Sequence, residues 1–505
     1  MPLQKNQVLT LQVERLSSDG SGVAHSPEGE TVFIPGAAPG DEARVRIVKD
    51  CKRYAFGILD EVLTPSPDRI PVDCAVAGPC GGCSLRHLDY AAELRAKQEN
   101  VADAFARIGG LDVPVLPIVG SPEIDRYRNK VQFPVGTDKA GRPCIGFYAG
   151  RTHRIVPCPD CRLQPGVLNE IGNTLCAFFA EKGIHPYNEE TGKGLVRHIF
   201  LRRGAHSGQI MVCLVSTRAK IPSADELCTR LKEAFPDVVT ILLNVNAKNT
   251  NVILGSETHT LYGQGYIEDT LCGVPVQLGP LSFYQVNTLA AEQLYGIAAE
   301  YAQLTPDDLL LDLYCGMGTI GLSMADHCRE LVGVEIVPEA IESAKANAAR
   351  MGAAVSAKSR FFCADAGQAA TQLAAEGLHP DVVMLDPPRK GCDEATLSAV
   401  VRMAPRRVVY VSCNPATAAR DAAWLEQNGY HAEKVQPVDL FPRTKHCECV
   451  IALSKGEIDS KKVRVEFSLE GMDTSGLQKG AAYPEIKARV LEQTGLKVSS
   501  LYISQ

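Results

Sequence analysis

The chain has 505 residues, 45% of them hydrophobic and 22% charged, with a formal net charge of −7. This length favours three or four domains, and the composition is that of an ordinary globular protein. No stretch approaches the ~18 apolar residues of a membrane span, and the amino-terminal segment lacks the apolar core of a signal peptide, which together predict a cytoplasmic protein without a membrane partner. The negative charge weighs weakly against a nucleic-acid partner, but local charge matters more than the sum.

Residues 1–63 predict an all-β domain, because alternating polar and apolar runs are broken by glycine, proline and serine or aspartate turns. About five short strands in this length suit a small barrel of the oligonucleotide-binding kind. A purely structural cap is the alternative. The same segment holds one basic run, made up of Arg44, Arg46, Lys49, Lys52 and Arg53.

A cysteine-rich stretch follows, with Cys74, Cys80 and Cys83 spaced C-x5-C-x2-C among glycines. Clustered cysteines in an intracellular chain favour a metal site over core packing. Zinc and an iron–sulfur cluster fit this spacing equally well. A fourth ligand must come from elsewhere in the chain, and Cys158 and Cys161 are the two candidates.

Residues 70–280 predict a central α+β region, beginning with a helix that Gly109 and Gly110 stop. Within it, residues 126–154 hold seven lysines and arginines and one aspartate, with four aromatic residues interleaved. Such a segment is either an RNA-binding surface or a solvated face of a sheet. The aromatic residues are Tyr127, Phe133, Phe147 and Tyr148.

Residues 281–455 alternate short apolar strands with helical segments, which predicts an open, mostly parallel α/β sheet. The last segment, residues 456–505, reads as two strands around a helix, a small extension to which the sequence assigns no role. Neither an obligate protein partner nor stable oligomerisation is indicated by these patterns.

The clearest ligand-binding signal in the α/β region is "LLLDLYCGMGTIGL", in which a buried strand runs into Gly316 and Gly318 before a helix. Glycines permit the tight turn and let a ligand approach the backbone. Glu335 ends the next strand, where a carboxylate can hold ribose hydroxyls. A nicotinamide-dependent oxidoreductase would show the same fingerprint. The sequence around Asp312, "DLYCGMG", resembles motif I of class I S-adenosylmethionine-dependent methyltransferases.

The ends of two later strands carry candidate functional residues. Asp386 begins "DPPRKG", where methyltransferases of base amines have an aromatic residue at the position of Arg389. Cys413 ends the fifth strand in "VYVSCNP". A thiolate there could add to C6 of a pyrimidine and so activate C5 for methylation. Removal of the C5 proton then needs a general base, and Glu448 in "HCECV" is the candidate.

Five motifs in family order, "FYQVN", "DLYCGMG", "LDPPRKG", "VSCNP" and "HCECV", resemble the RNA uracil-C5 methyltransferases, and the resemblance covers essentially residues 3–454. It implies Cys413 as the nucleophile and Glu448 as the base. The amino-terminal barrel resembles a TRAM domain, an RNA-binding module. By the same resemblance, S-adenosylmethionine is contacted by Gln285, Tyr314, Glu335 and Asp386, with Asp365 on the adenine side, beside Gly316 and Gly318.

The resemblance also implies a [4Fe–4S] cluster with a structural role, held by Cys74, Cys80, Cys83 and, before an x-Leu-x-Pro segment, Cys161 rather than Cys158. Members with both barrel and cluster cysteines modify uridine in 23S ribosomal RNA, so we expect that substrate, in single-stranded or looped form with the base flipped out of the stack. A transfer RNA enzyme is the alternative. A base-amine methyltransferase and a non-catalytic RNA-binding scaffold are further rivals.

Overall fold

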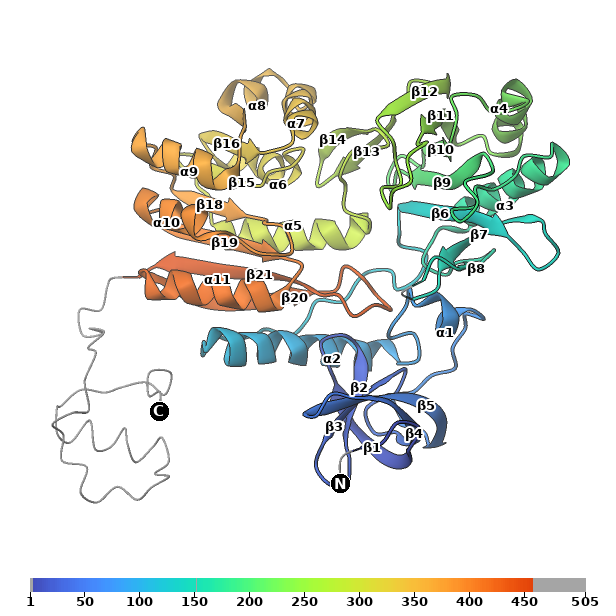
Figure 1. Ribbon diagram of the computed structural model, residues 1–505. Helices are drawn as coiled ribbons and strands as arrows, with labels where there is room; N and C mark the ends of the chain where they lie inside the picture. Colours follow the sequence, from blue (N-terminus) through green and yellow to red (C-terminus); the bar gives the residue numbers. More distant parts are fainter. Residues whose placement is uncertain (1–2, 151, 457–505) are drawn as a thin grey trace, which may run out of the picture.

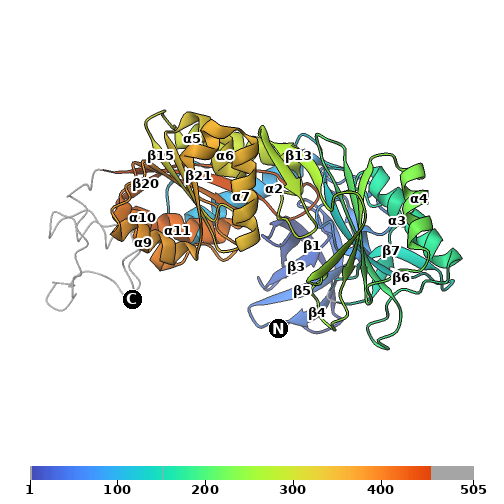
Figure 2. The ribbon, with the colours of Figure 1, turned by 90° about the horizontal axis from the view of Figure 1, so that it is seen from above.

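The structure is a computed structural model that describes residues 3–150 and 152–456, so the predicted extension lies outside the described residues apart from Gly456. Two large sheets lie side by side and a small barrel lies below them (Figure 1). Figure 2 shows the same two sheets from above. Within the described part of the chain, no helix is long and apolar enough to cross a membrane.

The amino-terminal domain is a closed five-stranded barrel with strand order β1-β2-β3-β5-β4, as predicted. Alternate side chains such as Val13, Val32 and Val45 fill its interior and are essentially inaccessible to solvent. β5 ends one residue beyond the predicted limit of 63. The strands are β1 (Val8–Leu16), β2 (Ser21–His25), β3 (Thr31–Pro35), β4 (Glu42–Asp50) and β5 (Tyr54–Thr64).

After the short α1 (Ala77–Cys80), the predicted long helix forms as α2 (Tyr90–Asp103) and continues as a π-helical turn, η1 (Ala104–Gly109). Asp89 caps its start by accepting a hydrogen bond from the Ala92 N–H at 2.7 Å, and Gly110 ends it in the left-handed conformation. The far end of this helix packs into the core of the carboxyl-terminal sheet, below its last strands (Figure 1). Although the chain places α2 in the central region, its packing therefore joins it to the carboxyl-terminal domain.

The central region is built on a seven-stranded sheet of order β12-β11-β10-β9-β6-β7-β8. Helices α3 (Gly166–Glu181) and α4 (Ala224–Ala234) cover one face of it through a shared apolar core. Side chains of the other face, among them Phe200 and Met211, pack toward the carboxyl-terminal domain. The strands are β6 (Lys130–Thr137), β7 (Pro143–Tyr148), β8 (Ile155–Pro157), β9 (Val196–Arg203), β10 (Ile210–Ser216), β11 (Val238–Val245) and β12 (Glu257–Tyr262).

A hairpin of β13 (Ile267–Leu271) and β14 (Val274–Leu278) leads into α5 (Thr288–Ala302). Its apolar side chains share one core with α5 and with the carboxyl-terminal sheet. In packing terms the carboxyl-terminal domain thus begins near residue 267, earlier than the predicted 281.

The carboxyl-terminal sheet has the order β17-β16-β15-β18-β19-β21-β20, with β15 to β19 parallel and β21 antiparallel to β19. This is the predicted α/β architecture. Its strands are β15 (Leu309–Leu313), β16 (Glu330–Glu335), β17 (Ser359–Cys363), β18 (Val382–Leu385), β19 (Arg407–Ser412), β20 (Tyr430–Val438) and β21 (Glu448–Lys455). Its helices are α6 (Thr319–Ser323), η2 (Ala325–His327), α7 (Pro338–Arg350), α8 (Ala353–Lys358), α9 (Ala366–Ala375), α10 (Glu394–Met403) and α11 (Pro415–Gln427).

Candidate functional site

The predicted nucleophile and base lie opposite each other across two neighbouring strands. β19 and β21 are antiparallel, and Ser412 pairs with Cys449. The next residue outward on each strand is Cys413 at the end of β19 and Glu448 at the start of β21. Because β21 runs against its neighbours, its first residue lies at the same edge as the carboxyl ends of the parallel strands.

Burial raises the pKa of all three acidic groups at this edge. The pKa of Glu448 rises to about 8, with a further contribution from the nearby charge of Asp386. Burial alone raises the pKa of Asp386 to about 7. The pKa of the Cys413 thiol rises to about 11, again by burial first and then by the charges of Glu448 and Asp386. These groups feel one another's charge, so a proton on one of them favours ionisation of the others.

Arg389 is the cation that opposes these shifts, since its charge lowers the pKa of both Cys413 and Glu448. Its carbonyl accepts hydrogen bonds from Asn414 Nδ2 at 3.0 Å and Thr417 Oγ1 at 3.3 Å. Its Nη2 lies 3.0 Å from Nδ1 of His446, two residues before Glu448. Arg389 therefore connects the loop after β18, the start of α11 and the segment before β21.

The glycine loop after β15 is held by buried Asp312, as the motif predicts. Asp312 Oδ2 accepts a hydrogen bond from the Gly321 N–H at 3.0 Å, and burial raises the pKa of this carboxyl to about 8. A Cβ added at Gly321 would lie 2.8 Å from Asp312 Oδ2, so this position requires glycine. Gly316 and Gly318 have φ of 55° and 78°, in the left-handed region that glycine adopts at no steric cost.

Glu335 ends β16 beside this loop. Its Oε2 accepts from the Gly316 N–H at 3.2 Å, and its Oε1 accepts from the Ile336 and Val337 N–H groups at 2.8 and 3.0 Å. Asp365 caps α9 by accepting from the Gln368 N–H at 3.1 Å. Both carboxylates lie at the edge of the sheet where a ligand of an open α/β fold binds.

Tyr314 and Gln285 flank the loop from two other directions. Tyr314 has a left-handed φ of 65°, unusual for a residue with a side chain, and its hydroxyl lies 3.3 Å from Thr396 Oγ1. Gln285 lies in the segment between β14 and α5, and its carbonyl accepts from Asn129 Nδ2 at 2.7 Å. The segment containing Gln285 is thus tied to the start of β6.

Sequence reasoning missed several exposed apolar side chains in these segments. Ile336 and Val337, directly after Glu335, are 61% and 45% exposed, and Phe283 is 71% exposed. Ile336 and Val337 therefore leave two adjacent apolar side chains in solvent beside the carboxylate of Glu335. Their signal in the sequence was the apolar pair "IV" after the acidic strand end, which periodicity alone cannot separate from core.

The predicted cluster cysteines come from two segments that meet. The thiols of Cys74, Cys80 and Cys161 interact electrostatically, and Cys158 and Cys161 share a hydrogen bond. This bond first, and then the Leu163 and Gln164 N–H groups, lower the pKa of Cys161 to about 6. Burial raises the pKa of Cys83 to about 11.

Arg86 fastens the first of these segments. It is 3% exposed and donates to Asp73 at 2.6 Å and to Asp125. Yet in residues 3–150 and 152–456, no group of three or more cysteine, histidine, aspartate or glutamate side chains is arranged to hold a metal ion. The cysteines are gathered, but the structure does not show the predicted cluster.

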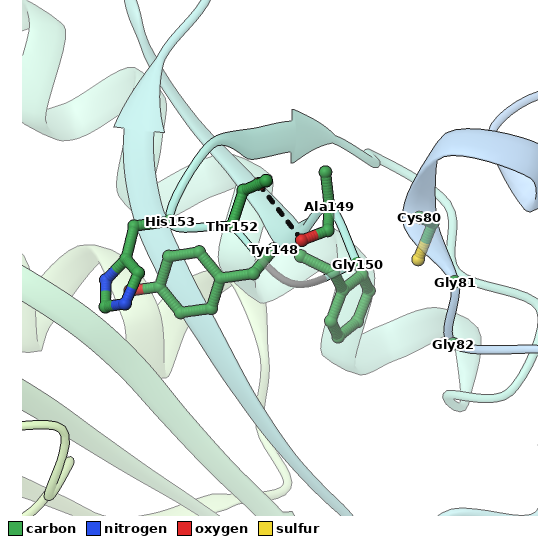
Figure 3. A pocket seen from close by; sticks show the side chains of 9 residues that line it. Cys80, Gly81, Gly82, Tyr148, Ala149, Gly150, Thr152 and His153 are labelled. Atoms are coloured by element: carbon green, nitrogen blue, oxygen red, sulfur yellow. Dashed lines mark hydrogen bonds between the residues drawn. The ribbon is translucent and has the colours of Figure 1, made fainter. Parts of the chain in front are cut away.

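A cavity of about 500 Å³ opens beside Cys80 (Figure 3). Its walls are the glycines after Cys80 and the turn from β7 to β8, where the rings of Tyr148 and His153 lie 5.6 Å apart. Cys413 and Glu448 do not line it, so it is separate from the edge of the carboxyl-terminal sheet. It is lined by Cys80, Gly81, Gly82, Phe147, Tyr148, Ala149, Gly150, Thr152 and His153.

The predicted basic segments are only partly available to a partner. In the barrel, Arg44 pairs with Glu61 at 2.6 Å and Arg46 pairs with Asp60 at 2.7 Å. Lys49, Lys52 and Arg53 are exposed. In the segment 126–154, Tyr127 and Phe133 are buried in the protein, so they cannot stack on RNA bases.

Comparisons with known proteins agree with this geometry. The tRNA (uracil-5-)-methyltransferase family matches residues 277–456, and the TRAM domain matches residues 2–59. An uncharacterized RNA methyltransferase of Halalkalibacterium halodurans is 44% identical over 453 residues, covering 90% of this chain and 98% of the relative. Another, from Clostridium tetani, is 41% identical over 454 residues, covering 90% and 98%.

The crystal structure of the Pyrococcus abyssi tRNA (uracil-54, C5)-methyltransferase in complex with S-adenosyl-L-homocysteine is also similar. Its TM-score is 0.70 at 28% identity, and the match covers 88% of this chain and 99% of that chain. The family model, the relatives and the similar fold all indicate the same family. The chain therefore belongs to the tRNA (uracil-5-)-methyltransferase family and is an RNA methyltransferase with an amino-terminal TRAM domain.

Proposed function

We propose that this protein transfers a methyl group from S-adenosylmethionine to C5 of a uridine in RNA, with Cys413 as nucleophile and Glu448 as general base. The observation that carries this proposal is the placement of the two side chains opposite each other across β19 and β21. A thiol and a carboxyl at one strand edge can act on adjacent atoms of one ring. An amine methyltransferase would need neither group.

The first step is addition of the Cys413 thiolate to C6 of the uracil, which breaks the C5=C6 double bond and makes C5 nucleophilic. The raised pKa of Cys413 means that the resting thiol is largely protonated near neutral pH. Arg389 favours the thiolate, since its charge lowers that pKa. It is placed to support the addition step electrostatically.

Glu448 completes the reaction by taking the proton from C5 after methylation. The C5–H electron pair then re-forms the C5=C6 double bond, and the C6–S bond breaks with its electrons returning to sulfur. A carboxyl whose pKa is raised to about 8 is a stronger base than an ordinary glutamate once ionised. Burial of Glu448 therefore suits it to removing a weakly acidic carbon-bound proton.

The methyl donor would lie over the glycine loop, and when bound it supplies an electrophilic methyl group. We propose that Glu335 orients the ribose and that Ile336 and Val337 cover the adenine ring. The bound S-adenosyl-L-homocysteine of the Pyrococcus abyssi enzyme supports a donor of this kind. The remaining proposed contacts are Gln285, Tyr314, Gly316, Gly318, Asp365 and Asp386.

For the substrate we propose 23S ribosomal RNA, on the resemblance to family members that carry both a barrel and cluster cysteines. Transfer RNA is a second candidate. The similar Pyrococcus abyssi enzyme is named for a transfer RNA uridine, and the match spans 88% of this chain. Because the match covers so much of the chain, the overall architecture alone does not discriminate between the two RNAs.

The barrel offers a surface for RNA on the outer side of β5. Tyr54, Phe56 and Ile58 alternate with buried residues and so share the outward face, and Phe33 pairs beside Phe56. Ring centroids of Phe33, Tyr54 and Phe56 lie 5.7 to 5.8 Å apart. Aromatic faces beside basic side chains bind unpaired nucleotides. We propose that Lys49, Lys52 and Arg53 supply the phosphate contacts.

We further propose that Cys74, Cys80, Cys83 and Cys161 hold a [4Fe–4S] cluster. The proximity of Cys80 to Cys74 and Cys161 supports a shared ligand set, and the N–H groups directed at Cys161 favour its thiolate. A four-iron cluster spaces its ligands more widely than a single metal ion does. Its role would be to stiffen the RNA-binding region, with no part in methyl transfer.

Mapping 5-methyluridine in the ribosomal and transfer RNA of a strain lacking this protein tests both the reaction and the substrate. We expect one or more 5-methyluridines to disappear from 23S ribosomal RNA and to return when the gene is restored. Loss from transfer RNA alone would favour the second candidate. If methylated amines disappeared and every 5-methyluridine stayed, the proposed reaction would be wrong, and RNA binding without methylation would indicate a scaffold.

A further inference from the structure

The segment Asp439–Arg443 follows β20 and forms the first part of the connection to β21, whose first residue is Glu448. It belongs to no helix or strand, so the backbone groups of such a segment must find partners elsewhere. Six of its backbone groups form hydrogen bonds with residues between positions 85 and 287, while the Phe441 N–H bonds locally to Asp439 Oδ1.

Four successive carbonyls and two N–H groups of this segment are bonded to residues from distant parts of the chain. The contacts are Leu440 O with Asn287 Nδ2 (3.0 Å), Phe441 O with Lys97 Nζ (3.2 Å), Pro442 O with the Tyr127 hydroxyl (3.0 Å), Arg443 O with the Leu85 N–H (3.1 Å), the Asp439 N–H with Val119 O (2.9 Å) and the Arg443 N–H with Glu93 Oε1 (2.7 Å).

A buried charge cluster lies at the centre of these contacts. Lys97, on α2, is 1% exposed, and its Nζ lies 2.7 Å from both Glu93 Oε1 and Asp439 Oδ1. The two carboxylate residues are fully buried. Arg443, 3.7 Å from Glu93 Oε2, brings the cluster to two cations and two anions. Within this charge cluster, Lys97 also donates a hydrogen bond to a backbone carbonyl of the segment. It therefore connects the ion pairs to the backbone that precedes the proposed base.

We propose that Lys97 is a positioning residue for the release of methylated RNA: through Glu93, Asp439 and the Phe441 carbonyl it fixes the segment that holds Glu448 over C5. This inference rests on the proposed role of Glu448. The nucleophile directly follows β19, and the next residue, Asn414, donates to the Arg389 carbonyl. Lys97 therefore bonds to the segment before the base and to none of these groups beside the nucleophile.

Loosening the segment has one specific consequence. Addition of Cys413 to C6 and methylation of C5 proceed, because neither step uses the Glu448 carboxylate. Proton removal from C5 slows, so the C6–S bond persists and the protein stays covalently attached to methylated RNA. A displacement of about 1 Å can cost a factor of about a hundred in a step that depends on close approach.

The test uses the full-length protein, S-adenosylmethionine with a labelled methyl group, and an RNA that the unaltered protein methylates. Lys97→Met keeps the length of the side chain and removes its charge. Tyr127→Phe removes only the hydroxyl that binds the Pro442 carbonyl. Methyl incorporation into RNA and the amount of protein–RNA complex that survives denaturation are followed over a single turnover.

For Lys97→Met we expect methylation of bound RNA within about threefold of the unaltered protein and release slowed about ten- to a hundredfold. A denaturation-resistant complex should then accumulate. Tyr127→Phe should give the same pattern more weakly, and it decides the question alone if Lys97→Met does not fold.

Arg197→Met is the matched control. Arg197 is also a buried cation that binds loop carbonyls, those of Asn246, Lys248 and Thr250, but in the central sheet. This variant should lose stability without accumulating the complex. Equal slowing of methylation and release in Lys97→Met and Tyr127→Phe, or no accumulation in either, would overturn the inference. Failure of both the unaltered protein and Glu448→Gln to form a covalent complex would instead refute the proposed function.

Discussion

The edge of the carboxyl-terminal sheet and the cysteine-rich segment both gather ionisable groups from distant parts of the chain, by different means. At the sheet edge, strand register places Cys413 opposite Glu448, and backbone hydrogen bonds along β19 and β21 fix that register. The cysteines lie outside the sheets instead, with Cys80 at the end of the short α1, and side-chain contacts such as those of Arg86 with Asp73 and Asp125 hold their segment.

This difference bears on how firmly the two sets of side chains are positioned. A register shift of one residue would move every side chain of β21 to the other face, so the face that Glu448 occupies is strongly determined. Loops that carry metal ligands depend on the bound group for part of their folding energy. The sheet edge is therefore preformed, whereas we expect the cysteine segment to need its cluster.

Cys413→Ala tests the sheet edge with the largest expected effect. Removing the nucleophile should reduce methyl transfer by at least about a thousandfold, because no other described side chain takes its place at the end of β19. Binding of S-adenosylmethionine, measured by calorimetry, should be unchanged. Full activity in this variant would show that the reaction does not proceed through a thiol adduct.

Glu448→Gln should separate the two halves of the reaction. Glutamine keeps the size of the side chain but cannot accept the C5 proton, so we expect turnover to fall about a hundred- to ten thousandfold. Covalent protein–RNA complex, visible on a denaturing gel, should accumulate in its place. Normal turnover without a complex would assign the base to another residue.

The pH profile gives a smaller effect. Since the pKa of Glu448 is raised to about 8, the fraction of ionised base falls as pH drops through that value, and release should slow toward acid pH. Arg389→Gln removes a charge that lowers the pKa of both Glu448 and Cys413, so the profile should move to higher pH. Arg406→Gln, at the opposite end of β19, is the control and should leave the profile in place.

Changes in the cysteine segment should affect activity least. Cys161→Ser should abolish the brown colour of anaerobically purified protein and lower its melting temperature, because metal binding contributes to folding. The rate of methyl transfer should stay within about twofold, since no reacting atom contacts this segment. Cys158→Ser is the matched variant and should retain the colour. The reverse result would make Cys158 the fourth ligand.

Part of the site was predictable from local sequence. The glycine loop, Asp312 and the acidic end of β16 follow one another within a single strand–turn–helix–strand unit, where local geometry decides the structure. Exposed Ile336 and Val337 were missed, because an apolar pair after a strand looks the same in sequence whether it faces core or solvent. The opposite error concerned Tyr127 and Phe133. Aromatic residues among charged ones resembled an exposed surface in the sequence, but both side chains are buried.

The sequence by itself determined the order of the strands along the chain, the barrel and the glycine loop, and it supplied the proposed reactive side chains, because each depends on short-range pattern or on motif. Only the tertiary structure decided that β21 runs antiparallel, which brings the start of one strand to the end of another. It also decided that α2 packs below β20 and β21 and inserts Lys97 between Glu93 and Asp439. Contacts between residues some 340 positions apart arise from packing, and no local pattern encodes them.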